Sequence, residues 1–190
     1  MGHAGSAHII PRIMANKTIS PAQQRVRAAF KVGAAFLAPL NGLIKKGFAE
    51  MAKRKNSLAS GLALGYTLQM AIKYETDGPV VDPALVRLSE GSLWGVVNGQ
   101  VHRYVDRIEV AHEMQFSSLV NHDDRLILCA YQVEKGYAFV NEQIWQRREG
   151  KVVVPIPEGF QDDGFHLYLL VSNRKGSKYS RSLYLGYSTK

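Results

Sequence analysis

The tripeptide Asp77-Gly78-Pro79 marks the clearest break in this 190-residue sequence. Aspartate, glycine and proline strongly favour turns, and here they separate two stretches with different hydrophobic periods. Before the break, apolar residues recur every three or four positions, which is typical of amphipathic helices. After it, apolar and polar residues alternate, which is typical of strands. The sequence therefore predicts a helical segment followed by an all-strand domain.

The first predicted helix begins at Ser20-Pro21. Ser20 and Gln23 form a capping-box pattern, and proline is tolerated at the first helical position because its missing N–H would have no partner there. The stripe that follows at helical spacing consists of Val26, Ala29, Phe30, Gly33, Ala34 and Leu37. Pro39 is expected to end or kink this helix, because its ring clashes with the preceding turn.

Two further short helices are expected before the break. One carries an apolar face made of Leu40, Leu43, Ile44, Phe48 and Met51. The other runs from a cap at Asn56 or Ser57 through Ile72. Helices this short can bury their apolar faces only against each other, against the rest of the chain or against a partner.

A series of short strands is predicted after the break. Their ranges are Leu85–Leu88, Arg107–Met114, Leu126–Glu134, Tyr137–Gln143, Lys151–Ile156, Phe165–Ser172 and Tyr179–Leu185. Short strands separated by turn residues favour an antiparallel β-sandwich of immunoglobulin-like or fibronectin-like type, so the predicted class is α+β. The expected domains are an N-terminal tail or short strands over 1–19, a basic helical segment over 20–76 and the sandwich over 77–190.

The basic charge is confined to the helical part. The chain has 24 Lys and Arg against 16 Asp and Glu, a formal net charge of +8. Residues 1–76 hold 11 of the basic and 2 of the acidic residues, a net charge of +9, which leaves −1 for residues 77–190. This asymmetry indicates an acidic partner, either protein or nucleic acid. The candidate contact residues are Arg25, Arg27, Lys45, Lys46, Lys53, Arg54 and Lys55.

The sequence shows none of the standard signatures of catalysis or cofactor binding. It has no glycine-rich phosphate loop, no Gly-x-Ser-x-Gly and no His-Glu-x-x-His. Its single cysteine, Cys129, lies in an apolar run and is predicted to be a buried strand residue. His122-Asp123-Asp124 and Asp162-Asp163 were the candidate polar sites, and a solvated loop and a turn are the favoured interpretations. We therefore predict no catalytic residue, no cofactor, no metal, no small-molecule substrate and no enzymatic activity.

Composition and segment lengths exclude further classes. With 46% hydrophobic and 21% charged residues, the chain can build a core and does not resemble a disordered protein. It contains no apolar stretch long enough to span a membrane, and no signal-peptide pattern at its N-terminus. The expected location is the cytoplasm or a virion.

Several short segments stand in a characteristic order: Thr18–Phe30, Phe36–Leu40, Lys46–Phe48, Ser89–Leu93 and Ser180–Gly186. In this order they resemble an uncharacterised family of bacterial and phage-associated proteins, a domain of unknown function. The resemblance implies a helical segment followed by an immunoglobulin-like sandwich. Family members usually begin with a glycine-rich basic hairpin, whereas His3–Asn16 stands in that place here. Similar segments in phage structural proteins imply an assembly role.

Three hypotheses follow from these observations. The first is a non-enzymatic structural or interaction protein, including a phage-like virion or assembly component, whose helical arm docks onto a protein partner or a second copy. The alternative is a nucleic-acid-binding protein that uses the basic helical face, with binding that weakens steeply as salt rises. The third is a carbohydrate-binding or enzymatic sandwich with its chemistry at loop residues such as His122 and Asp124.

Overall fold

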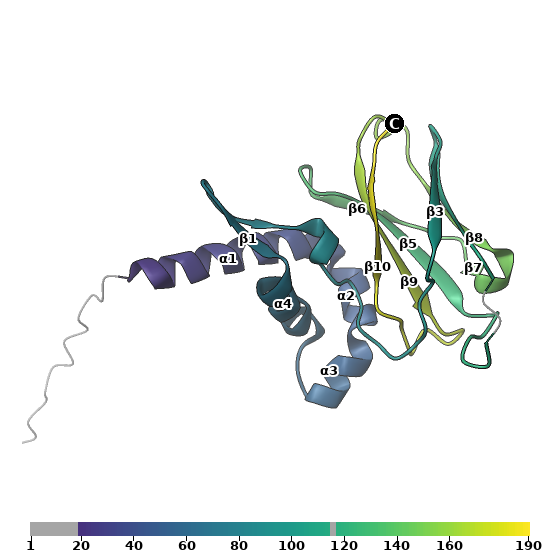
Figure 1. Cartoon of the computed structure of the whole chain (residues 1–190), viewed down its shortest axis with the longest axis horizontal. Helices are drawn as coiled ribbons and strands as arrows, with labels where there is room; N and C mark the ends of the chain where they lie inside the picture. Colours follow the sequence, from purple (N-terminus) through teal and green to yellow (C-terminus); the bar gives the residue numbers. More distant parts are fainter. Residues whose placement is uncertain (1–18, 115–116) are drawn as a thin grey trace, which may run out of the picture.

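A computed structural model describes residues 19–114 and 117–190 of the chain (Figure 1). The helical elements are α1 (Pro21–Leu37), η1 (Ala38–Leu40), α2 (Asn41–Gly47), α3 (Ala49–Lys55), α4 (Ala59–Met70), η2 (Pro83–Leu85) and η3 (Arg147–Glu149). The strands are β1 (Ile72–Glu75), β2 (Gly78–Val81), β3 (Gly99–Arg103), β4 (Arg107–His112), β5 (Arg125–Gln132), β6 (Tyr137–Val140), β7 (Trp145–Gln146), β8 (Lys151–Pro155), β9 (Phe165–Ser172) and β10 (Leu183–Ser188). The predicted α+β class, with helices ahead of antiparallel sheets, is confirmed. The prediction for residues 1–19 lies outside the described residues, except at Ile19.

The start and the end of α1 follow the sequence signals. The Gln23 N–H donates to Ser20 Oγ over 3.3 Å, and the Ser20 N–H donates to Gln23 Oε1 over 3.1 Å, which completes the capping box. The α-helix ends at Leu37, and Pro39 lies within the short 3-10 turn η1. The chain then continues directly into α2.

A hairpin lies at Asp77-Gly78-Pro79: Thr76 and Asp77 form its turn, and Gly78 and Pro79 begin β2. The helix expected to reach Ile72 ends at Met70, and β1 pairs antiparallel with β2 across this turn. Gly78 has a φ of 126°, a backbone conformation that favours glycine, and Asp-Gly is a strong hairpin signal. The Asp77-Gly78-Pro79 pattern therefore marks a hairpin between two short strands as well as a change of hydrophobic period.

The predicted strand at Leu85–Leu88 is wrong. Pro83–Leu85 forms η2 instead, because the Asp82 side chain accepts a hydrogen bond from the Ala84 N–H over 3.0 Å and so caps a turn. The last predicted strand begins at Leu183 rather than at Tyr179. The short strands β1, β2, β3 and β7 were missed, since strands with this little apolar alternation give a weak signal.

Two antiparallel sheets pack face to face. The larger has the order β10-β9-β5-β6, with β7 also paired to β5, and the smaller has the order β3-β4-β8. The core between them includes Ile108 and Val110 of β4, Leu126 and Leu128 of β5, Val152 and Val154 of β8, and Phe165, Leu167 and Leu169 of β9. The two sheets thus form a sandwich.

The helical segment covers the outer face of the larger sheet (Figure 1). A second core joins residues of that face to the helices, and it includes Cys129, Tyr131, Tyr168 and Leu170 together with Phe36, Leu40, Ile44 and Phe48. β5 and β9 are therefore buried on both faces, which explains why their sequences are almost continuously apolar. Cys129 is buried in a strand as predicted, and burial raises the pKa of its thiol to about 12.

Candidate functional site

Helix α1 extends beyond the rest of the molecule at its N-terminal end (Figure 1). Its buried residues are Ala29, Gly33, Phe36 and Leu37, and none of them lies in the first two turns of the helix. Val26 is 53% exposed, and Phe30, four residues later on the same side of the helix and directly after Ala29, is 49% exposed. The apolar stripe of α1 is thus only partly covered, because Ala29, Gly33 and Leu37 are buried whereas Val26 and Phe30 are exposed.

Basic residues lie beside this exposed part of the stripe. Arg27 and Lys31 are exposed and follow Val26 and Phe30 by one position each, so they form the adjacent row on the helix. The Arg25 guanidinium lies 3.8 Å from the ring centroid of the exposed Tyr74 in β1, a cation–π contact that joins α1 to the hairpin. We call these residues (Arg25, Val26, Arg27, Phe30, Lys31 and Tyr74) the arm surface.

The other predicted contact residues lie elsewhere on the helical layer. Lys45 and Lys46 occupy the last turn of α2, and Lys53, Arg54 and Lys55 the last turn of α3. All five are exposed, and positive charges in the last turn of a helix stabilise it by interacting with the negative end of the helix dipole. The N-terminal end of α1 and helix α3 lie at different ends of the helical layer (Figure 1), so the predicted residues do not gather in one patch.

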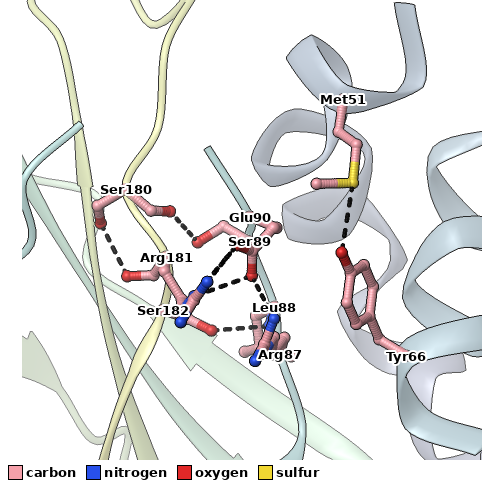
Figure 2. Close-up of polar contacts among 9 residues, drawn as sticks. All are labelled: Met51, Tyr66, Arg87, Leu88, Ser89, Glu90, Ser180, Arg181 and Ser182. Carbon is pink, nitrogen blue, oxygen red and sulfur yellow. Dashed lines mark hydrogen bonds and ion pairs between the residues drawn. The ribbon is translucent and has the colours of Figure 1, made fainter. Parts of the chain in front are cut away.

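A polar junction fixes the helical segment to the sandwich (Figure 2). The carboxylate of the buried Glu90 accepts hydrogen bonds from Arg181 Nη2 and from Arg87 Nη1, each over 2.8 Å, and from Arg181 Nε. Ser89 Oγ donates to the Ser180 carbonyl over 2.7 Å, and the Leu88 N–H donates to Ser182 Oγ over 2.9 Å. The stretch after η2 is thereby held against the stretch that precedes β10.

Two glycines allow this junction to close. A Cβ on Gly47 would lie 2.5 Å from the Leu88 carbonyl oxygen, and a Cβ on Gly91 would lie 2.1 Å from the Tyr179 carbonyl oxygen. The Glu90 N–H also donates to the Gly47 carbonyl over 3.2 Å, which joins the junction to the end of α2. Three of the segments that carry the sequence resemblance, around Gly47, Gly91 and Arg181, therefore meet at one place and serve the packing of helices on sheet.

The polar loop and turn candidates are engaged in structural contacts. Asp124 and Arg147, with side chains each 4% exposed, form an ion pair of 3.7 Å, and burial raises the pKa of Asp124. Asp163 accepts a hydrogen bond from Lys135 Nζ over 2.5 Å and another from the Tyr137 hydroxyl. These bonds lower the pKa of Asp163. Within residues 19–114 and 117–190 there is no group of three His, Cys, Asp or Glu placed to hold a metal ion.

Sequence reasoning missed two residues near the predicted ones. Tyr74 was placed at the end of a helical segment, although Asp-Gly three residues later is a recognisable hairpin signal. Arg125 lines a groove together with the predicted residue Lys46. It alternates with Ile127 and Cys129 on β5, but sequence alone does not show which part of a strand face a helix leaves open.

Comparison with known proteins gives one positive finding. A family model with the description "Family of unknown function (DUF6266)" matches residues 9–186. No curated protein matches the chain. None of the helices in residues 19–114 and 117–190 has the length and apolar character needed to cross a bilayer.

Proposed function

This chain belongs to the DUF6266 family of unknown function, and we propose that it is a non-enzymatic interaction protein whose helix α1 docks onto an acidic partner. The observation that carries the proposal is the division of the α1 stripe. Val26 and Phe30 belong to the stripe whose members Ala29, Gly33 and Leu37 are buried, yet they remain exposed. Contiguous exposed apolar residues with a polar rim are typical of interaction sites.

The charge of the helical segment indicates the chemistry of the partner. Within residues 19–76 there are nine basic residues and two acidic ones, Glu50 and Glu75. Two copies of α1 packed against each other would bring like charges together, whereas an acidic surface would be attracted. We therefore favour a different protein over a second copy of this chain.

The attachment of the helices supports the same proposal. The core shared with β5 and β9 buries Phe36 and Leu37 of α1, and the Tyr131 hydroxyl donates to the Phe36 carbonyl, so α1 has a fixed orientation relative to the sandwich. A preorganised surface binds with a smaller entropic cost than a flexible one. The sandwich then acts as the body from which the arm surface is presented.

The strand order supports an immunoglobulin-like or fibronectin-like relationship for that body. Leaving out the two-residue β7, the first, second and fifth strands after the hairpin form one sheet, and the third, fourth, sixth and seventh form the other. This division corresponds to the ABE and CFG strands of such domains, with a further strand beside C. An assembly role in a virion is a special form of the proposal that rests on the sequence resemblance alone.

An acidic amphipathic peptide tests the docking proposal. A fluorescent helical peptide of leucine and glutamate is titrated with the full chain, and a leucine–lysine peptide of equal length is the control. We expect saturable binding of the acidic peptide only, and its loss in the double variant Val26→Ser/Phe30→Ser. Equal binding of the two peptides, or unchanged binding by the double variant, would contradict the proposal.

The second candidate function is nucleic-acid binding by α2 and α3. It is favoured by one observation: Lys45, Lys46, Lys53, Arg54 and Lys55 are exposed, and none of them forms an ion pair within the described part of the chain. Titration with duplex DNA and single-stranded RNA across a salt series tests this function. Binding should weaken steeply with salt, and each phosphate-contacting lysine removed should reduce the salt slope by about 1. No retention at low salt would exclude it.

A further inference from the structure

A groove of about 430 Å³ lies between α2 and the connection from β6 to β7. Its volume falls within the range of about 300–1,000 Å³ that is usual for small-molecule sites. Its walls come from α2, β5, the β6–β7 connection and the turn that follows β9. The lining residues used below are Leu43, Lys46, Arg125, Ile127, Glu142 and Ile144.

Two cations line this groove. Lys46 is exposed and Arg125 is partly buried, and within the described residues neither side chain forms an ion pair or a hydrogen bond. Glu142 is the one acidic residue among the lining residues. The adjacent turn through Gly176, which also lines the groove, adds the exposed cations Arg174, Lys175 and Lys178. The groove is therefore surrounded by an excess of positive charge.

Apolar side chains make up much of the remaining wall. Leu43 and Ile127 are half-buried, and Ile144 on the β6–β7 connection is 55% exposed. A ligand with an apolar body would remove these side chains from water, which is favourable at about 25 cal/mol per Å² of apolar surface. The groove thus offers charge recognition and apolar contact together.

The wall opposite α2 is held in place by Asn141. Its Oδ1 accepts a hydrogen bond from the Leu128 N–H over 2.7 Å, and its Nδ2 donates to the carbonyls of Leu126, over 3.2 Å, and Gln143, over 2.8 Å. These bonds give hydrogen-bond partners to the backbone of β5 at the point between its pairing with β6 and its pairing with β7. The groove is consequently a fixed feature of the fold and exists before any ligand binds.

We propose that this groove binds an organic anion that carries a carboxylate or phosphate at one end of an apolar body. Lys46 and Arg125 would bind the charged end, and the apolar wall would contact the body. A second groove, between α1, β2 and the β5–β6 turn, has a similar volume of about 390 Å³ but no charged residue among those that line it. The combination of charge and apolar surface is therefore a property of the α2 groove, and its cations disfavour positively charged ligands.

Isothermal titration calorimetry of the full chain with octanoate, octylamine and inorganic phosphate tests this site. We expect octanoate to bind at one site per chain, phosphate more weakly, and octylamine without saturation. Lys46→Gln and Arg125→Gln should each weaken octanoate binding by about tenfold, because each removes one charge-assisted contact. Lys45→Gln is the matched control, since Lys45 is an exposed neighbour that does not line the groove. The affinity of the Lys45→Gln variant for octanoate should equal that of the unchanged chain.

The outcomes separate the site from its alternatives. Absence of saturable octanoate binding, equal binding of octylamine, or equal affinity in Lys46→Gln, Arg125→Gln and Lys45→Gln would each overturn the proposal. Lys46 is exposed on a helix, so Lys46→Gln keeps the test valid even where Arg125→Gln does not fold. Octanoate binding should also survive Val26→Ser/Phe30→Ser, which makes failure of this site distinguishable from failure of the arm surface.

Discussion

Helix α1 holds two phenylalanines in different environments. At the C-terminal end, Phe36 is 5% exposed and packs in the core between the helices and β5. Phe30, in the middle of the same helix and directly after the buried Ala29, is 49% exposed, and Val26, nearer the N-terminus, is 53% exposed. Val26 and Phe30 belong to the predicted apolar stripe together with Ala29, Gly33 and Leu37, and the rest of the chain covers only the last three. An apolar pattern therefore indicates a face to be buried, without indicating whether the chain or a partner buries it.

This difference predicts two classes of variant. Substitutions in the covered part of α1 and in the junction should lower the free energy of unfolding. Substitutions on the arm surface should leave that free energy almost unchanged and act on binding. The following predictions test this separation from the largest expected effect to the smallest.

Truncation of Phe36 should have the largest effect. Its ring contacts Tyr131 edge-on at 5.1 Å between centroids, and its carbonyl accepts a hydrogen bond from the Tyr131 hydroxyl over 2.9 Å. Phe36→Ala is expected to lower the free energy of unfolding by about 3–5 kcal/mol, through lost burial and the cavity that remains. Urea unfolding followed by circular dichroism measures it. A loss below about 1 kcal/mol would show that α1 is not part of the folded unit.

A methyl group at Gly91 should have the next largest effect. Its Cβ would lie 2.1 Å from the Tyr179 carbonyl oxygen, so the two backbone segments of the junction would have to separate. Gly91→Ala should lower the free energy of unfolding by about 3 kcal/mol. The control is Gly65→Ala on α4, where no atom lies within 4 Å of the new Cβ; it should raise that free energy by about 0.5–1 kcal/mol. Equal effects of the two variants would contradict the role of the junction.

The sequence was sufficient for the local features and insufficient for the pairing of segments. The capping box at Ser20, the end of α1 before Pro39 and the buried strand at Cys129 each depend on neighbouring residues. The hairpin at Asp77-Gly78 was partly visible, because its turn was recognised while its short strands were too polar to be identified.

The candidate sites were harder to predict from the sequence than the helices and strands were. Lys46 and Arg125 are far apart in the chain, and they share a groove only because α2 packs on β5. Glu90 and Arg181 are also far apart in the chain, and they meet because the stretch after η2 lies against the stretch before β10. The basic residues predicted as contacts are exposed, but their division between α1, α2 and α3 depends on the angles between helices, which no local pattern specifies.

Removal of the charge at the junction should have an intermediate effect. Glu90→Gln takes away the carboxylate that joins Arg87 and Arg181, although Arg181 remains partly solvated. We expect the free energy of unfolding to fall by about 1–2 kcal/mol, which urea unfolding resolves. The control is Glu134→Gln in the exposed turn after β5, which should change it by less than about 0.5 kcal/mol. A Glu90 variant as stable as its control would show that the junction is held by its backbone contacts alone.

His166, at the edge of the covered sheet face, should make stability depend weakly on pH. Burial lowers the pKa of His166, although Asp82 opposes this shift, and its Nδ1 lies 2.9 Å from the Tyr184 hydroxyl. The unfolded chain therefore takes up a proton first as the pH falls, so this contribution to stability is complete above the ordinary pKa of about 6.5 and is lost below it. Urea midpoints between about pH 5 and about pH 7.5 measure the slope, which should be smaller in His166→Gln. An identical slope in both proteins would contradict the assignment.

Phe30→Ala should have the smallest effect on folding and a large effect on binding. Its side chain is about half exposed, so its removal creates no internal cavity, and the free energy of unfolding should change by about 0.5 kcal/mol or less. Binding of the acidic leucine–glutamate peptide should weaken by at least about tenfold, which corresponds to about 1.4 kcal/mol for an aromatic contact at an interface. Fluorescence anisotropy measures the second quantity and urea unfolding the first. If Phe30→Ala instead destabilised the fold as strongly as Phe36→Ala, Phe30 would belong to the folded core, and the proposed role of its side chain in binding a partner would be wrong.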